Sequence, residues 1–286
     1  MKSAFLRRPF SAGFSARRAS RGIAILLLLA MSLIQPAAAA GVEHWEDRPA
    51  LDRHFQAAGM RGTIVVLDEA SGRWIASDSR RAHVRYLPAS TFKIPNTLIA
   101  LETGIAADAA QPWRWDGVQR EFPDWNRDQT LESAFKVSAV WVYQDIARKV
   151  GAERMAAFVR DFRYGNAETG PALERFWLDG ELRISAVEQV DFLRRFLAGT
   201  LPLSERSQRL GRELMLREET PAYRLYAKTG WTGGGPDSLG WYVGWVERGA
   251  QRSYFALNID MPGGIAQAPL RERLVRIVLG ELGLMR

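Results

Sequence analysis

The order in which two hydrophobic patterns follow one another is the feature that most constrains how this chain folds. Residues 62–68 (GTIVVLD) and 73–78 are β-rich runs joined by a turn-like segment, which predicts a hairpin. Apolar side chains then follow helical spacing through most of residues 107–217. The clearest helical segments are 140–150 and 186–196. Strand candidates follow at 238–247 and 253–261, and a last helix is predicted at 270–282.

This order predicts an α/β (α+β) fold, in which both ends of the chain build one antiparallel sheet flanked by helices. A helical domain is inserted between the two ends. We place the sheet subdomain at about residues 41–106 and 218–286 and the helical subdomain at about 107–217. The last helix is expected to pack on the sheet through four apolar residues, Leu270, Leu274, Ile277 and Val278.

Residues 1–40 have the pattern of a secretory signal peptide. They hold six basic residues and no acidic one, followed by an apolar run over 23–34 and by four alanines that end at Ala40. The run is too short to span a bilayer, and small residues suit a signal peptidase. We expect cleavage near residues 38–40 and a periplasmic protein; an uncleaved anchor is the alternative. Two arginine pairs hint at twin-arginine export but lack the complete motif.

The net charge of +7 does not indicate a nucleic-acid-binding protein. Without residues 1–40 the chain has 33 basic and 32 acidic residues, so it offers no bulk attraction to a polyanion. We expect no nucleic-acid partner and no stable membrane anchor once the signal is removed. The chain has no cysteine, so an exported protein of this sequence depends on its packed core for stability.

A serine and a lysine lie three residues apart in residues 90–93 (STFK), at the start of a helix predicted after Pro88. Residues at this spacing share one helix face, so the hydroxyl of Ser90 and the amine of Lys93 can meet. A serine becomes a nucleophile when an adjacent base takes its proton. A lysine acts as that base only if its pKa falls from about 10.4, and burial lowers it.

The pair alone does not establish a catalytic site. Ser90 could simply cap the helix and Lys93 could be a solvated lysine, and a second Ser-x-x-Lys occurs at residues 133–136. A rarer signal is Lys-Thr-Gly at 228–230, just before a strand candidate, where a glycine lets a substrate approach the backbone closely. Only four lysines lie beyond the signal segment, and Lys93 and Lys228 are two of them.

The combination of motifs is more specific than any one of them. Ser-x-x-Lys, a serine triad and Lys-Thr-Gly, in this order, are typical of penicillin-binding proteins and serine β-lactamases. The triad here is residues 138–140 (SAV), with Val140 where transpeptidases and class A enzymes usually have asparagine. Further matching segments are 88–96 (PASTFKIPN), 164–166 (YGN), 176–180 (FWLDG) and 244–247 (GWVE). From about residue 45 onward, the chain resembles the class D, or oxacillinase-type, serine β-lactamases.

The resemblance implies a serine β-lactamase/penicillin-binding-protein fold and hydrolysis of the β-lactam ring of penicillin-type antibiotics, giving resistance. It also implies that Lys93 reacts with CO2 or bicarbonate to form a carbamate (N6-carboxylysine) that is the general base. Phe92, Val140 and Leu178 would keep this lysine dry, and the indole N–H of Trp177 would donate to the carbamate. No other cofactor is implied.

The resemblance assigns the remaining groups as well. Ser138 would shuttle a proton to the lactam nitrogen, and the backbone N–H groups of Ser90 and Trp231 would form the oxyanion hole. The substrate carboxylate would be held by Lys228, Thr229 and Arg271. Gly230, in the same motif, would let the substrate approach the backbone closely. The assignment of Arg271 competes with a solvated helix arginine, because Arg273 and Arg276 lie on the same predicted helix. The resemblance also makes Ser133 a chance match.

Two other classes of protein share these motifs. A penicillin-binding D,D-peptidase is disfavoured by Val140 and by the YGN motif. A β-lactam sensor acylates without turnover but carries several membrane spans upstream; a class D homologue with little activity is a third reading. The three histidines, His44, His54 and His83, lack metal-ligand spacing, so we predict no metal. Class D enzymes occur as monomers and homodimers, and the substrate spectrum depends on the loop at 232–237.

Overall fold

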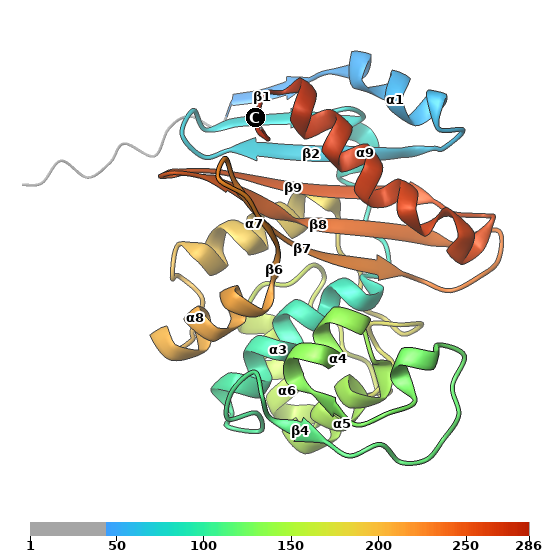
Figure 1. The fold of residues 1–286 in the computed structure, drawn as a ribbon, viewed down its shortest axis with the longest axis vertical. Helices are drawn as coiled ribbons and strands as arrows, with labels where there is room; N and C mark the ends of the chain where they lie inside the picture. Colours follow the sequence, from blue (N-terminus) through green and yellow to red (C-terminus); the bar gives the residue numbers. More distant parts are fainter. Residues whose placement is uncertain (1–43, 286) are drawn as a thin grey trace, which may run out of the picture. The chain divides into compact units, whose positions relative to one another are not determined.

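The structure is a computed structural model that describes residues 44–285, so the predicted signal segment lies outside the described residues. The described residues form one compact unit. Its centre is a seven-stranded sheet in the order β1-β3-β2-β9-β8-β7-β6 (Figure 1). The strands are β1 (His44–Asp47), β2 (Gly62–Asp68), β3 (Arg73–Ala76), β6 (Leu216–Glu219), β7 (Arg224–Trp231), β8 (Leu239–Arg248) and β9 (Gln251–Asp260), and a separate pair is β4 (Pro112–Trp113) and β5 (Gln129–Thr130).

Helices cover both faces of this sheet. On one face α9 (Ala268–Glu281) crosses β8 and β9 and contacts α1 (Asp52–Ala57). On the other face α7 (Ala186–Leu197) packs on β2, β8 and β9. The remaining α-helices are α2 (Ser79–Ala82), α3 (Lys93–Glu102), α4 (Leu131–Val137), α5 (Val140–Val150), α6 (Ala152–Asp161) and α8 (Glu205–Leu214). Short 3₁₀ helices are η1 (Pro49–Leu51), η2 (Ala89–Phe92), η3 (Pro123–Trp125) and η4 (Gly264–Gln267).

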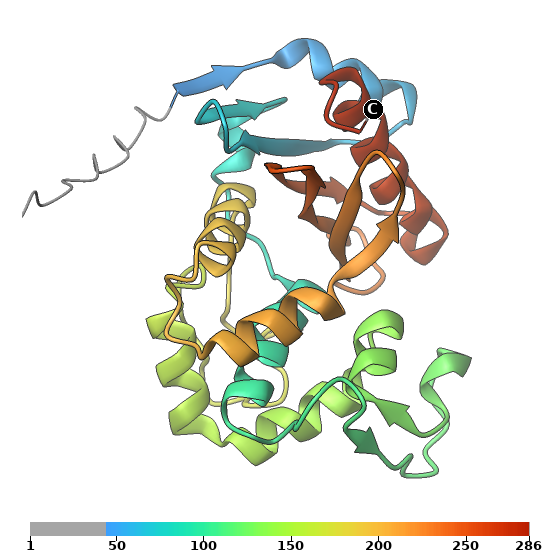
Figure 2. The same cartoon turned by 60° about the vertical axis from the view of Figure 1, so that its left-hand side comes forward.

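The helix that follows the Ser90 segment is the centre of the helical part. α3 contacts α5, α6 and α8, and Figure 2 shows these helices gathered below the sheet. Nine of its ten residues are buried, including Lys93 and Asn96. A helix enclosed on all sides in this way can hold a polar side chain away from water, which is the condition that an active lysine requires.

The predicted fold class is confirmed. Both ends of the chain supply the sheet, β2 and β3 form the predicted antiparallel hairpin, and the predicted helices and later strands occur within a few residues of their expected bounds. No helix among residues 44–285 is long and apolar enough to cross a membrane.

The sheet differs from the prediction in one respect, because it is not wholly antiparallel. β1 pairs in parallel with β3, with His44 opposite Arg73 and Asp47 opposite Ala76. The connection from β1 to β3 runs through η1, α1 and β2, and a connection of this length permits parallel pairing. The prediction also missed β1, β6 and β7; the Lys-Thr-Gly motif lies inside β7 rather than before a strand.

The predicted apolar face of the last helix is only partly right. Ile277 is 38% exposed, and Leu270 is half-buried, whereas Leu274 and Val278 are buried as expected. The buried side of α9 is rotated toward a set that includes an arginine: Arg271, Leu274, Val275, Val278 and Leu279. The apolar residues alone do not predict which side of α9 is buried, because the side chain of Arg271 also turns inward and donates to a carbonyl of β7.

Gly165 generates a test of local packing. Its φ is +58°, and a Cβ at this position would collide with the carbonyl oxygen of Arg183. We expect Gly165→Ala to lower the free energy of unfolding by about 3 kcal/mol, from backbone strain plus the collision. Gly72→Ala is the matched control, since Gly72 has a φ of +67° and open space around it, and should cost about 1 kcal/mol. Equal losses in urea unfolding would show that the collision is relieved.

Candidate active site

Ser90 is presented by a strained turn. Ala89, directly before it, has a φ of +48°, a conformation that a residue with a Cβ rarely adopts. The turn is held by the Ala89 N–H, which donates to the Trp177 carbonyl at 2.9 Å, and by the Thr91 hydroxyl, which donates to the Pro88 carbonyl at 2.7 Å. Strain of this kind persists only where the surroundings enforce it, and it is typical of functional sites.

Lys93 lies one helical turn after Ser90 and is completely buried. Its Nζ is 2.9 Å from the Ser90 Oγ and 5.1 Å from the centroid of the Tyr143 ring. Burial lowers the pKa of Lys93 from 10.5 to about 7. A large fraction of this amine is therefore unprotonated near neutral pH, and it can accept the proton of Ser90.

Aromatic side chains pack around Phe92, the residue directly before the buried Lys93, and we call this buried region the chamber around Lys93. Phe92 stacks on Trp177 at 5.4 Å, and Phe176 meets both rings edge-on at 4.9 Å. The indole Nε1 of Trp177 is buried and has no hydrogen-bond partner among the described residues. Leaving such a donor unpaired costs about 1–3 kcal/mol, so an acceptor absent from the polypeptide is expected beside it.

A second serine–lysine pair faces the first. Ser138 ends α4 with a φ of +58°, and its Oγ accepts a hydrogen bond of 2.5 Å from the Nζ of Lys228. The Lys228 side chain is 4% exposed and lies over the Phe135 ring. Burial lowers the pKa of Lys228, and the nearby charge of Lys93 adds to the effect. This pair can therefore pass a proton through the Ser138 hydroxyl.

The free edge of β7 forms one wall of the site. β6 pairs with β7 only from Arg224 to Tyr226, so no strand of the described residues lies beside residues 228–231 on that side. A Cβ on Gly230 would lie 3.0 Å from the Pro88 carbonyl oxygen and 3.1 Å from the Thr91 side chain. A glycine at this position thus allows the Ser90 turn to approach the strand.

Arg271 reaches this wall from α9. It is 8% exposed, its Nη1 donates to the Gly230 carbonyl at 2.5 Å, and its Nε donates to the Ala268 carbonyl at 2.9 Å. Burial lowers the pKa of Arg271 to about 10, so the group stays charged near neutral pH. The structure thereby distinguishes it from the solvated alternative, since Arg273 is exposed and Arg276 is paired with Glu218 and Glu272.

The structure brings most of the predicted residues together. Direct contacts link Lys93 to Ser90, Lys228 to Ser138, Gly230 to the Ser90 turn and Arg271 to Gly230. Trp177 is buried, and its carbonyl accepts a hydrogen bond from the N–H of Ala89, directly before Ser90. The remaining predicted residues are half-buried and lie one or two positions from Ser138, Trp177, Lys228 or Gly230: Val140, Leu178, Thr229 and Trp231. Phe122, which the sequence did not single out, meets the Trp231 ring edge-on at 6.4 Å.

The second Ser-x-x-Lys is a structural segment. Ser133 makes reciprocal capping hydrogen bonds with Thr130 at the start of α4, and its hydroxyl also donates to Gln129. Lys136 forms an exposed ion pair with Glu132 at 2.6 Å. Neither side chain is arranged as a nucleophile or a base.

A hydrogen-bond network behind Ser90 was missed by the sequence analysis. Gln189 on α7 donates to the Thr91 hydroxyl at 2.8 Å, and the Tyr164 hydroxyl lies 3.3 Å from Gln189 and 3.5 Å from Thr91. Asn166 fixes the loop that follows Tyr164, because its side-chain oxygen accepts a hydrogen bond from the Arg183 N–H at 2.8 Å. The YGN motif was a signal for this region, but no spacing rule connects it with Gln189.

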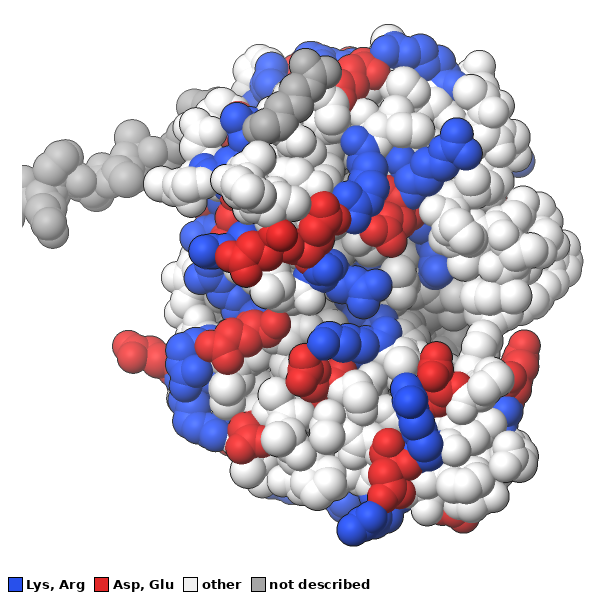
Figure 3. Space-filling view, in the orientation of Figure 1, with Lys and Arg blue, Asp and Glu red and all other residues white. Residues whose placement is uncertain are grey.

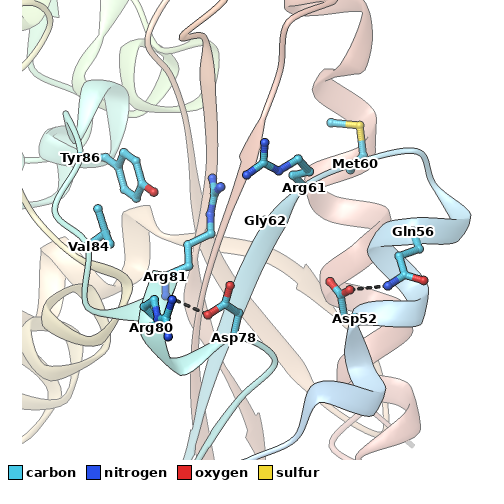
Figure 4. Close-up of a pocket in the computed structure, with 10 residues that line it drawn as sticks. All are labelled: Asp52, Gln56, Met60, Arg61, Gly62, Asp78, Arg80, Arg81, Val84 and Tyr86. Carbon is cyan, nitrogen blue, oxygen red and sulfur yellow. Dashed lines mark hydrogen bonds between the residues drawn. The ribbon is translucent and has the colours of Figure 1, made fainter.

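Other polar features carry no catalytic arrangement. Among residues 44–285, no group of three or more His, Cys, Asp or Glu residues could hold a metal ion. A separate hollow of about 520 Å³, lined by α1, α2 and the start of β2, contains none of the predicted site residues (Figure 4). Its Asp52 and Asp78 accept hydrogen bonds from Gln56 and from the Arg81 backbone. Figure 3 shows acidic and basic side chains interspersed on one face of the molecule.

Comparisons with known proteins agree with this geometry. The family described as "Penicillin binding protein transpeptidase domain" matches residues 62–279. β-Lactamase OXA-48 of Klebsiella pneumoniae is 40% identical over 256 residues, which cover 88% of this chain and 96% of that protein. β-Lactamase OXA-2 of Salmonella typhimurium is 44% identical over 230 residues, covering 80% and 81%. The crystal structure of the class D β-lactamase YbXI from Nostoc has a TM-score of 0.80 and 40% identity, covering 82% and 98%.

The fold and the two serine–lysine pairs define a serine enzyme of the penicillin-binding-protein transpeptidase type. Within that class, the chain belongs to the class D β-lactamases.

The buried Lys93 amine predicts a pH dependence of stability. Between pH 7 and pH 10.5 the unfolded chain binds a proton on Lys93 that the folded chain releases, so stability rises with pH in this window. Relative to Lys93→Met, the parent should gain about 1.4 kcal/mol of unfolding free energy per pH unit. Urea unfolding of both proteins at pH 7 and pH 9 in CO2-depleted buffer measures this difference. A constant difference would contradict the burial of an ionisable amine.

Proposed function

We propose that the protein hydrolyses the β-lactam ring of penicillin-type antibiotics through an acyl-enzyme on Ser90, and thereby confers resistance. The observation that carries the proposal is the 2.9 Å contact between the Ser90 Oγ and a completely buried Lys93. The relatives are named β-lactamases, which supports the same reaction here.

Acylation uses the groups already described. The Ser90 Oγ attacks the lactam carbonyl carbon while its proton passes to the side chain of Lys93. The N–H groups of Ser90 and Trp231 would hold the developing oxyanion. The N–H of Ser90 lies at the start of a helix, where N–H groups lack intrahelical acceptors. As the carbon–nitrogen bond of the ring breaks, Ser138 donates its proton to the nitrogen and is reprotonated through Lys228, whose Nζ is 2.5 Å away.

The substrate carboxylate would bind at the free edge of β7. Lys228, Thr229 and Arg271 supply two cations and a hydroxyl at this edge, and the Arg271 guanidinium is held there by the Gly230 carbonyl. An anion placed here would relieve the repulsion between the cations. A carboxylate held at this edge would set the lactam carbonyl next to Ser90.

Hydrolysis of the acyl-enzyme requires a base after acylation, and the chamber around Lys93 fits a carbamate. A largely unprotonated lysine can react with CO2, and the unpaired Trp177 indole N–H is a donor suited to a carbamate oxygen. The carbamate would supply an anionic oxygen base for activating water. Phe92, Val140 and Leu178 would keep that base dry.

Turnover separates this proposal from the alternative of a β-lactam sensor or a D,D-peptidase, which would acylate and stop. Because the sensor or D,D-peptidase alternative differs in deacylation alone, a single experiment can separate the two functions.

We also propose that residues 1–40 direct export to the periplasm and are removed there.

The experiment is turnover of benzylpenicillin and a chromogenic cephalosporin by the mature protein, with intact mass recorded. We expect many turnovers per protein and activity that bicarbonate restores after decay at low pH. Ser90→Ala should lose both turnover and the covalent adduct, whereas Lys93→Ala should lose at least about 100-fold in turnover, the usual contribution of a general base. A stable Ser90 adduct without turnover would favour a sensor, and near-normal hydrolysis by Lys93→Ala would remove that residue from its role.

A further inference from the structure

Arg217 is a cation at the edge of the site that neither the motifs nor the proposed mechanism uses. It occupies the irregular position of β6, between Leu216, which pairs with Tyr226, and Glu218, which pairs with Leu225. Its side chain is exposed and makes no hydrogen bond or ion pair with any residue from 44 to 285. Most arginines of the described residues are paired with carboxylates, and Arg217 is one of a few that are not.

The acidic groups beside Arg217 are already occupied. Glu218 accepts hydrogen bonds from Arg276 at 2.5 Å and from the Tyr223 hydroxyl at 2.6 Å. Glu272 accepts from the same Arg276 at 2.8 Å. Because Arg276 takes both carboxylates, the charge of Arg217 stays available to a ligand.

The position of Arg217 relative to the free edge of β7 follows from the strand register. β6 begins where the Ala227 N–H donates to the Met215 carbonyl, and the free edge starts at the next residue, Lys228. The backbone of Arg217 lies opposite the Leu225–Tyr226 region, so roughly 10 Å of strand separates it from Thr229. A side chain as long as that of arginine can cover much of this distance.

Two further groups locate the Arg217 charge. It contributes to the lowered pKa of Lys228, on the helix side of the sheet, and it acts on the pKa of Tyr242, which pairs with Thr229 and packs on the α9 side. A charge that acts on groups on both faces lies near the edge between them. The Tyr242 hydroxyl is buried and has no partner among the described residues.

The chemistry of a bound β-lactam then gives the charge a role. With the lactam carbonyl between the N–H groups of Ser90 and Trp231 and the ring carboxylate beside Thr229, the substrate runs along β7 toward its beginning. In a cephalosporin, the ring carbon next to the one bearing the carboxylate carries the 3-substituent. This substituent would therefore extend from Thr229 toward Arg217.

We propose that Arg217 is a specificity-determining residue that favours cephalosporins with an anionic 3-substituent over those with a neutral or cationic one. The inference rests on the proposed function, because it extends the same carboxylate-binding edge. Arg271 and Lys228 bind the ring carboxylate common to all substrates, whereas Arg217 attracts the second anion that only some of them carry. Added salt should weaken this preference, since Arg217 is exposed.

The test uses cephalosporins with the same 7-acyl group and an anionic, neutral or cationic 3-substituent. For each, kcat/KM is measured with the parent, Arg217→Gln, Arg217→Lys and Arg224→Gln. We expect Arg217→Gln to lower the anionic-to-neutral ratio of kcat/KM about fivefold, as for one exposed ion pair, and Arg217→Lys to retain most of the ratio. Arg224→Gln is the matched control, since Arg224 lies on the same hairpin and is paired with Glu219 at 2.6 Å.

An unchanged ratio in Arg217→Gln would overturn the proposal, and so would an equal drop in Arg224→Gln, which would indicate a general effect of surface charge. Acylation rates from intact mass are recorded for the same compounds. If the parent acylates but does not turn over, the proposed function fails, while the ratio of acylation rates still decides the role of Arg217.

Discussion

The burial of one amine, that of Lys93, is the constraint on which the rest of the site depends. Each unit by which the pKa falls represents about 1.4 kcal/mol of lost preference for the charged form, and burial takes Lys93 from 10.5 to about 7. The fold accepts this cost by enclosing α3 among α5, α6 and α8 and by stacking Phe92 on Trp177. The result is a lysine that can exchange a proton with Ser90.

Backbone strain is concentrated around the same chamber. Four non-glycine residues in the range 44–285 have a positive φ, and all lie at or beside the quoted motifs: Ala89, Ser138, Arg163 and Ala167. The strain at Ala89 points Ser90 away from the normal course of the helix, and the strain at Ser138 places its hydroxyl against Lys228. Each strained turn is stabilised by buried neighbours, which is why the site needs the whole core around it.

The sequence predicted the two-ended sheet and the inserted helices, because periodicity is a local signal, and its motifs named candidate site residues that the structure brings into contact. It did not predict the parallel pairing of β1, the extra strands β6 and β7 or the exposure of Ile277, because these depend on contacts between distant segments. The contact of Gln189 with Thr91 spans 98 residues and follows from no spacing rule. Arg217 was also overlooked, because it is marked by having no partner among the described residues, and no sequence pattern reveals this.

The most direct test of the role of Lys93 is carbon-13 NMR of the folded protein in labelled bicarbonate, with Lys93→Met and Trp177→Phe as comparisons. The account predicts a carbamate resonance in the parent, none in Lys93→Met, and a weaker one in Trp177→Phe, which lacks the indole donor. Full turnover without a carbamate resonance would contradict it and would leave the unmodified amine of Lys93 as the base.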